Sequence, residues 1–557
     1  MRSPRAVTFA ALLAIIAVGF VLRAVPVLGN PWPVGDGGLF YTMVGELRAN
    51  GLALPWFTSY NHEGIPFAYP PLALELAAVL ESVTGMARSD VFRLVPLTFS
   101  TLCIPAVYLV ALELQRDGDP RGSARASASP AVRGGPRALF ATLVYATFPL
   151  AWEWLTLGSG LTRSVGMFFA LLATWQGLVL LRRGRSIAIV ATGLLAGLAA
   201  LSHPEAAVFV LLGLGARVVV EHSWRYLRDL VLAALVAVVV AGPWIAVVAV
   251  RHGLAPLADA AGGVGRDPVA SAVVYVFGFF LASPLPLAAV LDLLGQVRAI
   301  VGRRPYLVLW RLAVCFLDLR FALVAAVVPL SVLAADGLFG VLVPALRTGV
   351  RERRGALAGA FLAGVASAGL VVASLLTPSV FLAPHVALAA PDRAAMAWVR
   401  ATQPADRRFL VLATDTWGSD DLSEWFPALT ARSTLDTGEG SEWLAPALRL
   451  SMAAAEVDLR TCQPSALGCV TRWLDVHGGQ DAAVYVPANG SAYASGADPS
   501  AAIRGRLLGS PAFRVIYDGP GAVILAFRGG AAAGARPVAR AMDRETSGSR
   551  PIIGISM

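Results

Sequence analysis

Long apolar stretches follow one another through the first two thirds of the chain, separated by short polar loops. The first covers residues 6–28, and most of the others are close to the roughly 20 residues that a membrane-spanning helix needs. We predict the further spans at 91–112, 138–156, 163–181, 186–202, 204–220, 230–250, 271–297, 306–318, 321–344 and 356–376. The pattern predicts a polytopic α-helical membrane protein with about 11–13 transmembrane helices, and we treat residues 1–377 as its transmembrane domain.

The first long polar interruption is the loop 29–70. Within it, residues 38–50 carry apolar side chains at helical spacing, which predicts an amphipathic helix that lies in the membrane interface. The next apolar run, 70–85, begins with two prolines and carries Glu75 and Glu81. It is either a full span or a short, tilted helix.

The charge pattern favours the short helix. With 57% hydrophobic and 15% charged residues and a mean hydropathy of +0.67, the chain is far more apolar than a soluble protein. The net charge of +9 comes from arginines in short loops, where they orient helices, so we predict no nucleic-acid partner. If 70–85 does not span, the arginine-rich loops near 121–137, 182–185, 225–228, 298–304 and 347–354 all lie in the cytoplasm.

This topology predicts a cytoplasmic N-terminus behind an uncleaved first helix, in a bacterial cytoplasmic membrane. From residue 378 the composition becomes that of a soluble chain. We expect a small extracytoplasmic α/β domain over 378–528 and a disordered tail over 529–557. Its predicted elements are helices at 391–400 and 421–429, strands at 409–413 and 483–487, and a hairpin at 513–527. Cys462 and Cys469 lie close together in the sequence; we predict a disulfide, with two free thiols as the alternative.

Polar groups gather on the predicted outer side. They come from the first loop, from three turns and from one further loop between spans. Each charge taken alone is also explained as a helix-end residue that reaches the interface. Together they offer carboxylates at Asp36, Glu63, Glu153, Glu205 and Asp318 and guanidinium groups at Arg163, Arg251 and Arg320, a set that suits a phosphate-linked substrate.

Three short motifs on this side resemble the GT-C superfamily of integral-membrane glycosyltransferases, which includes the protein mannosyltransferases, the aminoarabinose transferases and uncharacterised bacterial branches. The first is Gly35-Asp36-Gly37, followed by Tyr41 on the amphipathic helix. The second is Tyr69-Pro70-Pro71-Leu72, which opens the next helix. The third, Leu201 to Glu205, ends a helix of small residues.

The resemblance implies a transferase that takes a sugar from a polyprenyl-phosphate carrier and passes it to an extracytoplasmic lipid, glycan or protein. In the family an aspartate of the first loop deprotonates or orients the acceptor hydroxyl, and Asp36 matches it; the alternative is that Asp36 is a turn residue among glycines. Gly37 stands where many members have glutamate, which leaves the sugar open. The residues expected to bind substrate are Tyr41, His62, Glu63, Tyr69, Arg163, His203, Glu205, Arg251 and Arg320.

Trp417, Trp425 and Trp443 lie in a segment rich in acidic residues and serine, a composition that suits stacking on an acceptor sugar. The equal alternative is that they pack the domain onto the membrane surface.

No cofactor is firmly implied. His62, Glu63, His203 and Glu205 are residue types that bind divalent metals, but no metal-binding spacing joins them, and hydrogen-bonded histidines are the competing interpretation.

The rival function is an envelope lipid or polysaccharide transporter, or a scaffold without catalysis. The sequence shows no clear internal repeat, which a transporter would be expected to have. No nucleotide-binding loop of the GxxxxGK[ST] type is present either.

Overall fold

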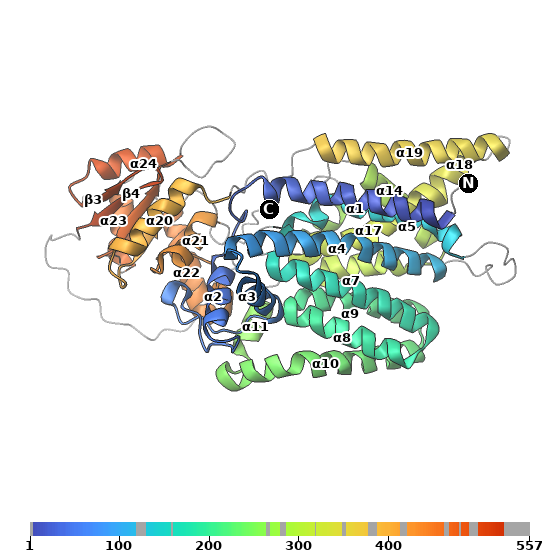
Figure 1. The fold of residues 1–557 in the computed structure, drawn as a ribbon, viewed down its shortest axis with the longest axis horizontal. Coiled ribbons are helices and arrows are strands. Elements are labelled where there is room, and N and C mark those ends of the chain that lie inside the picture. The colour runs from blue at the N-terminus through green and yellow to red at the C-terminus, as the bar shows by residue number, and fades with distance from the viewer. Residues whose placement is uncertain are drawn as a thin grey trace.

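A helical bundle and a smaller mixed α/β part make up the computed structural model of the protein (Figure 1). The structure describes residues 4–117, 130–156, 160–262, 268–278, 286–317, 319–347, 352–376, 387–412, 420–461, 467–477, 479, 481–488 and 499–528. The longer helices of the bundle are α1 (Pro4–Leu28), α4 (Arg88–Asp117), α5 (Pro130–Thr147), α7 (Gly160–Arg183), α8 (Ser186–Ser202), α9 (Pro204–Glu221), α10 (Trp224–His252), α14 (Pro286–Val301), α15 (Tyr306–Leu317), α17 (Val327–Gly337) and α19 (Glu352–Leu376).

Short helical segments connect them. They are η2 (Pro149–Ala151), α6 (Glu153–Thr156), α11 (Ala255–Gly262), α12 (Pro268–Val273), the π-helices η3 (Val274–Gly278) and η4 (Leu338–Leu342), α16 (Leu319–Ala325) and α18 (Val343–Arg347).

Six described helical segments are long and apolar enough to cross a membrane. A seventh is added if α5 and the short helices after it count as one span bent by 86°. The protein is therefore a multi-pass membrane protein, although this number is below the predicted 11–13. Three predicted spans appear instead as shorter apolar helices, Ser186–Ser202, Pro268–Phe277 and Tyr306–Leu317.

The predicted span 138–156 is broken at Phe148. Phe148 has an extended backbone and precedes Pro149, which lacks the N–H that would continue the helix.

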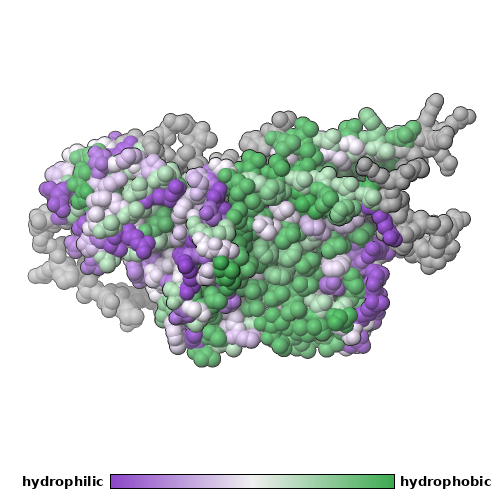
Figure 2. Space-filling view, in the orientation of Figure 1, coloured by the Kyte–Doolittle hydropathy of each residue, from purple (hydrophilic) through white to green (hydrophobic). Residues whose placement is uncertain are grey.

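The surface of the bundle is a broad apolar band between two polar margins (Figure 2). Large apolar side chains of α10, including Val231, Leu235 and Val239, are exposed, as expected of a helix that faces lipid.

Arginines of two basic loops, 182–185 and 225–228, lie together at one end of the bundle, which we call the basic end. Arg182 at the end of α7 pairs with Glu113 near the end of α4, and Arg225 at the start of α10 donates to the Leu181 carbonyl. At the other end of α10, Arg251 donates to the carbonyls of Leu54 and Pro55 in the first loop. We call this opposite end the loop end.

The first loop contains α2 (Gly38–Ala49), the 3-10 turn η1 (Tyr60–His62) and, after it, α3 (Leu72–Thr84). With 13 residues, α3 spans about 20 Å and is too short to cross the bilayer, in agreement with the charge pattern. The predicted helix at 38–50 is present as α2, but its apolar face packs against α3 and the C-terminal part rather than only against lipid.

The C-terminal part is a four-stranded sheet with helices on both faces. Its strands are β1 (Phe409–Val411), β2 (Ala483–Pro487), β3 (Phe513–Asp518) and β4 (Ala522–Phe527), in the order β1-β2-β4-β3. β1 and β2 are parallel and the other pairs antiparallel. The helices are α20 (Ala390–Thr402), α21 (Asp421–Thr430), η5 (Ser441–Trp443), α22 (Pro446–Thr461), α23 (Leu467–Val476) and α24 (Pro499–Leu508).

Side-chain alternation builds two cores around this sheet. Phe409 and Tyr485 point to the face covered by α20 and α21, whereas Leu410 and Val484 point to the face covered by α23 and α24. All the C-terminal elements predicted from the sequence are present, while α22, α23 and α24 were not predicted.

Candidate functional site

The site lies where α21 meets the first loop. The indole N–H of Trp425 donates to the Gly35 carbonyl at 2.8 Å, and the Trp425 ring packs against Trp32 and Tyr41 with centroids 5.3 and 5.4 Å apart. The Tyr60 hydroxyl lies 2.6 Å from the Glu424 carbonyl oxygen. These contacts fix the loop that carries Asp36 against the C-terminal part.

Three carboxylates meet at this junction. Asp36 comes from the first loop, Glu424 from α21 and Glu439 from the segment before η5. Each offers one oxygen, and the three oxygens lie within 4.8 Å of one another. Glu439 is held in place because its Oε2 accepts hydrogen bonds from the Leu39 N–H at 3.1 Å and from the Tyr60 hydroxyl at 3.0 Å.

Burial and mutual repulsion disfavour the ionised form of the carboxyl groups in this cluster. Burial, followed by repulsion from Glu439 and Asp36, raises the pKa of Glu424 well above its ordinary value. Burial and repulsion from Asp36 likewise raise the pKa of Glu439, against its hydrogen bonds to Leu39 and Tyr60. Two unit charges 4.8 Å apart repel by about 3 kcal/mol at an effective dielectric constant of about 20. Protons or a cation must therefore offset part of this charge.

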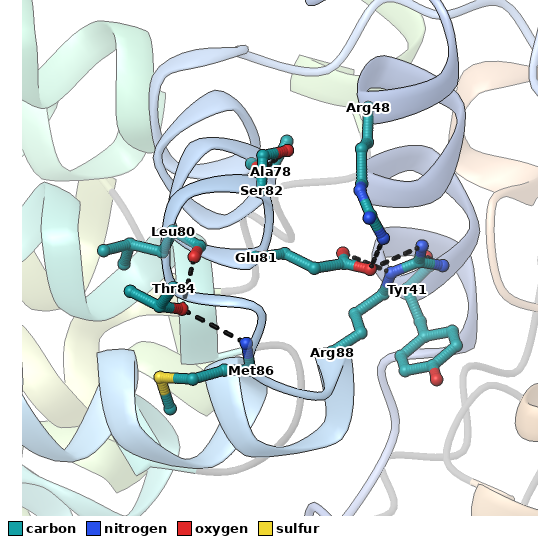
Figure 3. Close-up of polar contacts among 9 residues, drawn as sticks. All are labelled: Tyr41, Arg48, Ala78, Leu80, Glu81, Ser82, Thr84, Met86 and Arg88. Carbon is teal, nitrogen blue, oxygen red and sulfur yellow. Dashed lines mark hydrogen bonds and ion pairs between the residues drawn. The ribbon is translucent and has the colours of Figure 1, made fainter.

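An ion-pair cluster joins α2 of the first loop to α3 and α4 (Figure 3). Glu81 of α3 accepts from Arg48 of α2 at 2.7 Å and from Arg88 of α4 at 2.9 Å. Arg88 also donates to the Tyr41 carbonyl and lies over the Tyr41 ring, 4.8 Å from its centroid. Tyr41 thus contacts both Arg88 of α4 and Trp425 of α21, and it links these two helices through the first loop.

A second polar group lies on the bundle side of the loop. The Tyr69 hydroxyl is 3.3 Å from Thr162 Oγ1 and 3.4 Å from His203 Nδ1. His203 Nε2 is 2.9 Å from Glu205 Oε2. Trp443 packs edge-on against the Tyr69 ring at 5.4 Å. The structure thus brings together the predicted residues Tyr69, His203, Glu205 and Trp443, in a group separate from the carboxylate cluster.

The remaining predicted residues are dispersed around the loop end. His62 is exposed with φ of 55°, and Glu63 follows it. Arg163 lies over the Trp154 ring at 4.6 Å, and Arg251 lies over Trp56 at 5.2 Å. Arg320 lies on α16, but its side chain is outside the described part of the chain, as are Trp417, Cys462 and Asp318.

The structure gives direct observations on two further predicted residues, Cys469 and Trp425. Cys469 of α23 is in a disulfide, but its predicted partner is not described, so the pairing stays a prediction. Trp425 is fully buried, so it offers no free face for an acceptor sugar; the packing alternative describes it, with the first loop rather than the membrane as its contact.

Glu424 and Glu439 were missed at the level of the sequence, although both lie in the segment singled out for its acidic residues and tryptophans. The signal was available in α21, where Glu424 lies between the apolar residues Leu422, Trp425 and Phe426. An acidic residue inside such a run is buried only when something stabilises it.

The comparison with known proteins gives structural matches alone. No family model matches the sequence, and no curated protein matches it. The crystal structure of ArnT from Cupriavidus metallidurans bound to undecaprenyl phosphate is similar over 94% of this chain and 99% of that chain, with a TM-score of 0.52 and 17% identity.

Two further structures match over a similar share of this chain but a smaller share of their own. AglB from Archaeoglobus fulgidus, in complex with an inhibitory peptide and a dolichol-phosphate, covers 91% of this chain and 79% of its own, with a TM-score of 0.53 and 14% identity. A mutant of the arabinofuranosyltransferase AftD from Mycobacteria gives a TM-score of 0.55 at 15% identity, over 93% of this chain and 41% of that chain. The chain therefore has the fold of the GT-C glycosyltransferases over most of its length.

Proposed function

We propose that the protein is a membrane glycosyltransferase that moves a sugar from a polyprenyl-phosphate donor to an extracytoplasmic acceptor. The observation that carries the proposal is the match along nearly the whole of ArnT, a structure that holds undecaprenyl phosphate. AglB, which matches comparably, holds a dolichol-phosphate. Both ligands are polyprenyl phosphates, so the proposal takes this class of carrier for the donor.

Asp36 is the proposed catalytic residue. In the proposed reaction an acceptor oxygen forms a bond to the anomeric carbon of the sugar while the bond from that carbon to the phosphate oxygen breaks. The Asp36 carboxylate orients the acceptor hydroxyl and takes its proton, and the polyprenyl phosphate leaves with the bonding electrons. The position of Asp36 between the bundle and the C-terminal part suits a donor held in lipid and an acceptor in water.

Donor binding is proposed for the bundle side of the loop. Tyr69, His203 and Glu205 form a connected polar group there, and Arg163 and Arg251 lie at the same end. Guanidinium groups suit a phosphate that gains charge as it leaves. His62, Glu63, Tyr41 and Arg320 remain proposed contacts of the substrate.

Disruption of the gene followed by mass analysis of envelope glycans and lipid-linked sugars tests the proposal. We expect one lipid-linked sugar to accumulate and one glycan modification to disappear. Wild-type protein should restore the pattern and Asp36→Asn should not, because an amide cannot accept the proton. The exposed Asp406→Asn is the matched control and should restore it.

Full restoration by Asp36→Asn, at the same protein level, would remove Asp36 as the catalytic residue. An unchanged glycan and lipid profile after disruption would remove the proposed activity. The transporter alternative predicts a different result: purified protein in vesicles would move lipid-linked sugar between leaflets without any acceptor being modified.

A further inference from the structure

The carboxylates of Asp36, Glu424 and Glu439 have the spacing of ligands that share one ion. Their three oxygens lie within 4.8 Å of one another. Oxygen ligands of Ca²⁺ lie about 2.3–2.6 Å from the ion, so two of them are at most about 5 Å apart. The cluster meets this limit for every pair of its members.

The burial of Glu424 is a second and independent sign of a ligand. Its side chain is 1% exposed, and its Oε2 has no hydrogen-bond partner among the described residues. A carboxylate oxygen removed from water without a partner is strongly disfavoured, and most such oxygens in proteins are paired. A cation between the three carboxylates would give the buried Glu424 carboxylate a charged partner.

We propose that Asp36, Glu424 and Glu439 bind a divalent cation that holds the C-terminal part on the first loop. Asp36 and Glu424 belong to segments almost 390 residues apart, which are already joined by the Trp425–Gly35 hydrogen bond. An ion bound by both segments is a cross-link between them. The donor set consists of oxygens alone, which suits Mg²⁺, Mn²⁺ or Ca²⁺ better than Zn²⁺ or Cu²⁺.

The surroundings prepare the cluster for a cation. Hydrogen bonds from Leu39 and Tyr60 orient Glu439 before any ion arrives. Further acidic residues, Asp420, Asp421 and Glu442, are close enough to act on the cluster electrostatically. Asp420 is itself engaged as the N-cap of α21, where its side chain accepts from the N–H groups of Leu422 and Ser423. The negative field of this group raises the local concentration of cations.

The experiment uses the full chain, purified in detergent and stripped with a chelator. Mn²⁺ is titrated while the melting temperature is followed by tryptophan fluorescence. Tb³⁺ is a second probe, because its emission is sensitised by a nearby aromatic ring and the Tyr60 hydroxyl lies 3.0 Å from Glu439. The variants are Glu424→Gln and Glu439→Gln, and Glu442→Gln is the control, since Glu442 is nearby but outside the cluster.

We expect the wild type and Glu442→Gln to bind one ion and to melt at a higher temperature with Mn²⁺. Glu424→Gln should bind at least tenfold more weakly, yet melt at or above the wild-type temperature in chelator, because the amide relieves the repulsion. Weaker ion binding combined with an undiminished melting temperature in chelator distinguishes the loss of a ligand from misfolding. Hydrogen exchange of α21 should slow on addition of Mn²⁺ in the wild type and stay unchanged in Glu424→Gln.

An equal response of the wild type and Glu424→Gln to Mn²⁺ would overturn the proposal. A wild type that responds to pH but not to Mn²⁺, Mg²⁺ or Ca²⁺ would also overturn it and would mean that the three carboxyls share protons. No substrate is present in these measurements, so a failure of the proposed sugar transfer leaves their outcome unaffected.

Discussion

Two glutamates near the first loop, Glu81 and Glu63, differ in whether a positively charged side chain neutralises them. Glu81 is paired with both Arg48 and Arg88, so its buried carboxylate has two cationic partners. The buried Oε2 of Glu63, in contrast, has no hydrogen-bond partner among the described residues. Burial, partly offset by a hydrogen bond with Asn61, raises the pKa of Glu63 to about 7. The carboxyl group of Glu63 therefore titrates near neutral pH.

This shift predicts a pH-dependent stability. The folded protein holds the Glu63 proton at pH values where the unfolded chain, with an ordinary pKa of 4.5, has lost it. The contribution of Glu63 to the stability is therefore fully present below about pH 4.5 and is lost as the pH rises to about 7. The difference between the two pKa values corresponds to at most about 3 kcal/mol.

We expect Glu63→Gln to melt at a higher temperature than the wild type at pH 8 and at nearly the same temperature at pH 4.5. Melting curves at the two pH values, with the exposed Glu221→Gln as control, measure the difference. The same offset at both pH values would show that the substitution acts through packing and not through titration.

At the scale of elements, the docking of α21 on α2 is decided by one glycine. A Cβ added at Gly38 would lie 2.0 Å from the Glu424 carbonyl oxygen and 3.3 Å from the Trp425 Cα. Real Cβ atoms do not approach backbone that closely, so any larger residue at position 38 must push α21 away. The close approach is what allows Glu424 to reach Asp36.

Gly38→Ala should therefore loosen this junction, by roughly 1–3 kcal/mol from overpacking. We expect faster hydrogen exchange in α21 and in residues 30–47. Gly505→Ala is the matched control: Gly505 lies inside α24 with nothing within 4 Å of its added Cβ, so helix propensity should leave it neutral or slightly more stable. An unchanged rate of hydrogen exchange in α21 of Gly38→Ala would show that the added methyl group does not weaken the contact between α2 and α21.

Local patterns were enough to predict most elements of the C-terminal sheet. The strand at 483–487 reads as a buried apolar run, and Gly519-Pro520-Gly521 marks the turn between β3 and β4. α22 was not recognised because its sequence mixes alanine, arginine and acidic residues. α23 was missed although Val470, Trp473 and Leu474 recur at helical spacing and are buried. The break at Phe148–Pro149 was missed because apolar residues continue on both sides of it.

At the scale of the whole molecule, charge separates the two ends of the bundle. Arg182 and Arg225 mark the basic end, and Arg251 marks the loop end together with the C-terminal part. The positive-inside rule then predicts that the basic end faces the cytoplasm.

Labelling of single cysteines measures this orientation. The free cysteines that the structure describes, Cys103 and Cys315, are buried and should not react. Asp406→Cys and Arg185→Cys place exposed thiols on the C-terminal part and at the basic end. A maleimide that cannot cross the membrane should label position 406 in intact spheroplasts and position 185 only after lysis. The reverse result would invert the topology.

The candidate site could be predicted only in part, because its residues come from distant parts of the chain. Asp36 was found because a short motif resembles a known family, and the motif is local. The partners of Asp36 are brought to it by tertiary packing, as the separation of 400 residues between Leu39 and Glu439 shows. Apolar periodicity does not encode which distant helix docks on a loop, so Glu424 and Glu439 emerged only from the fold.

The distance along the chain between Asp36 and Glu424 also sets an order of events during biosynthesis. The aspartate leaves the ribosome early, and α21 is made only after the spans of the bundle have been synthesised. A nascent or prematurely terminated chain can insert its first helices and still lack two of the three acidic groups. The carboxylate cluster is therefore completed late, when the final third of the chain, with Glu424 and Glu439, has been translated.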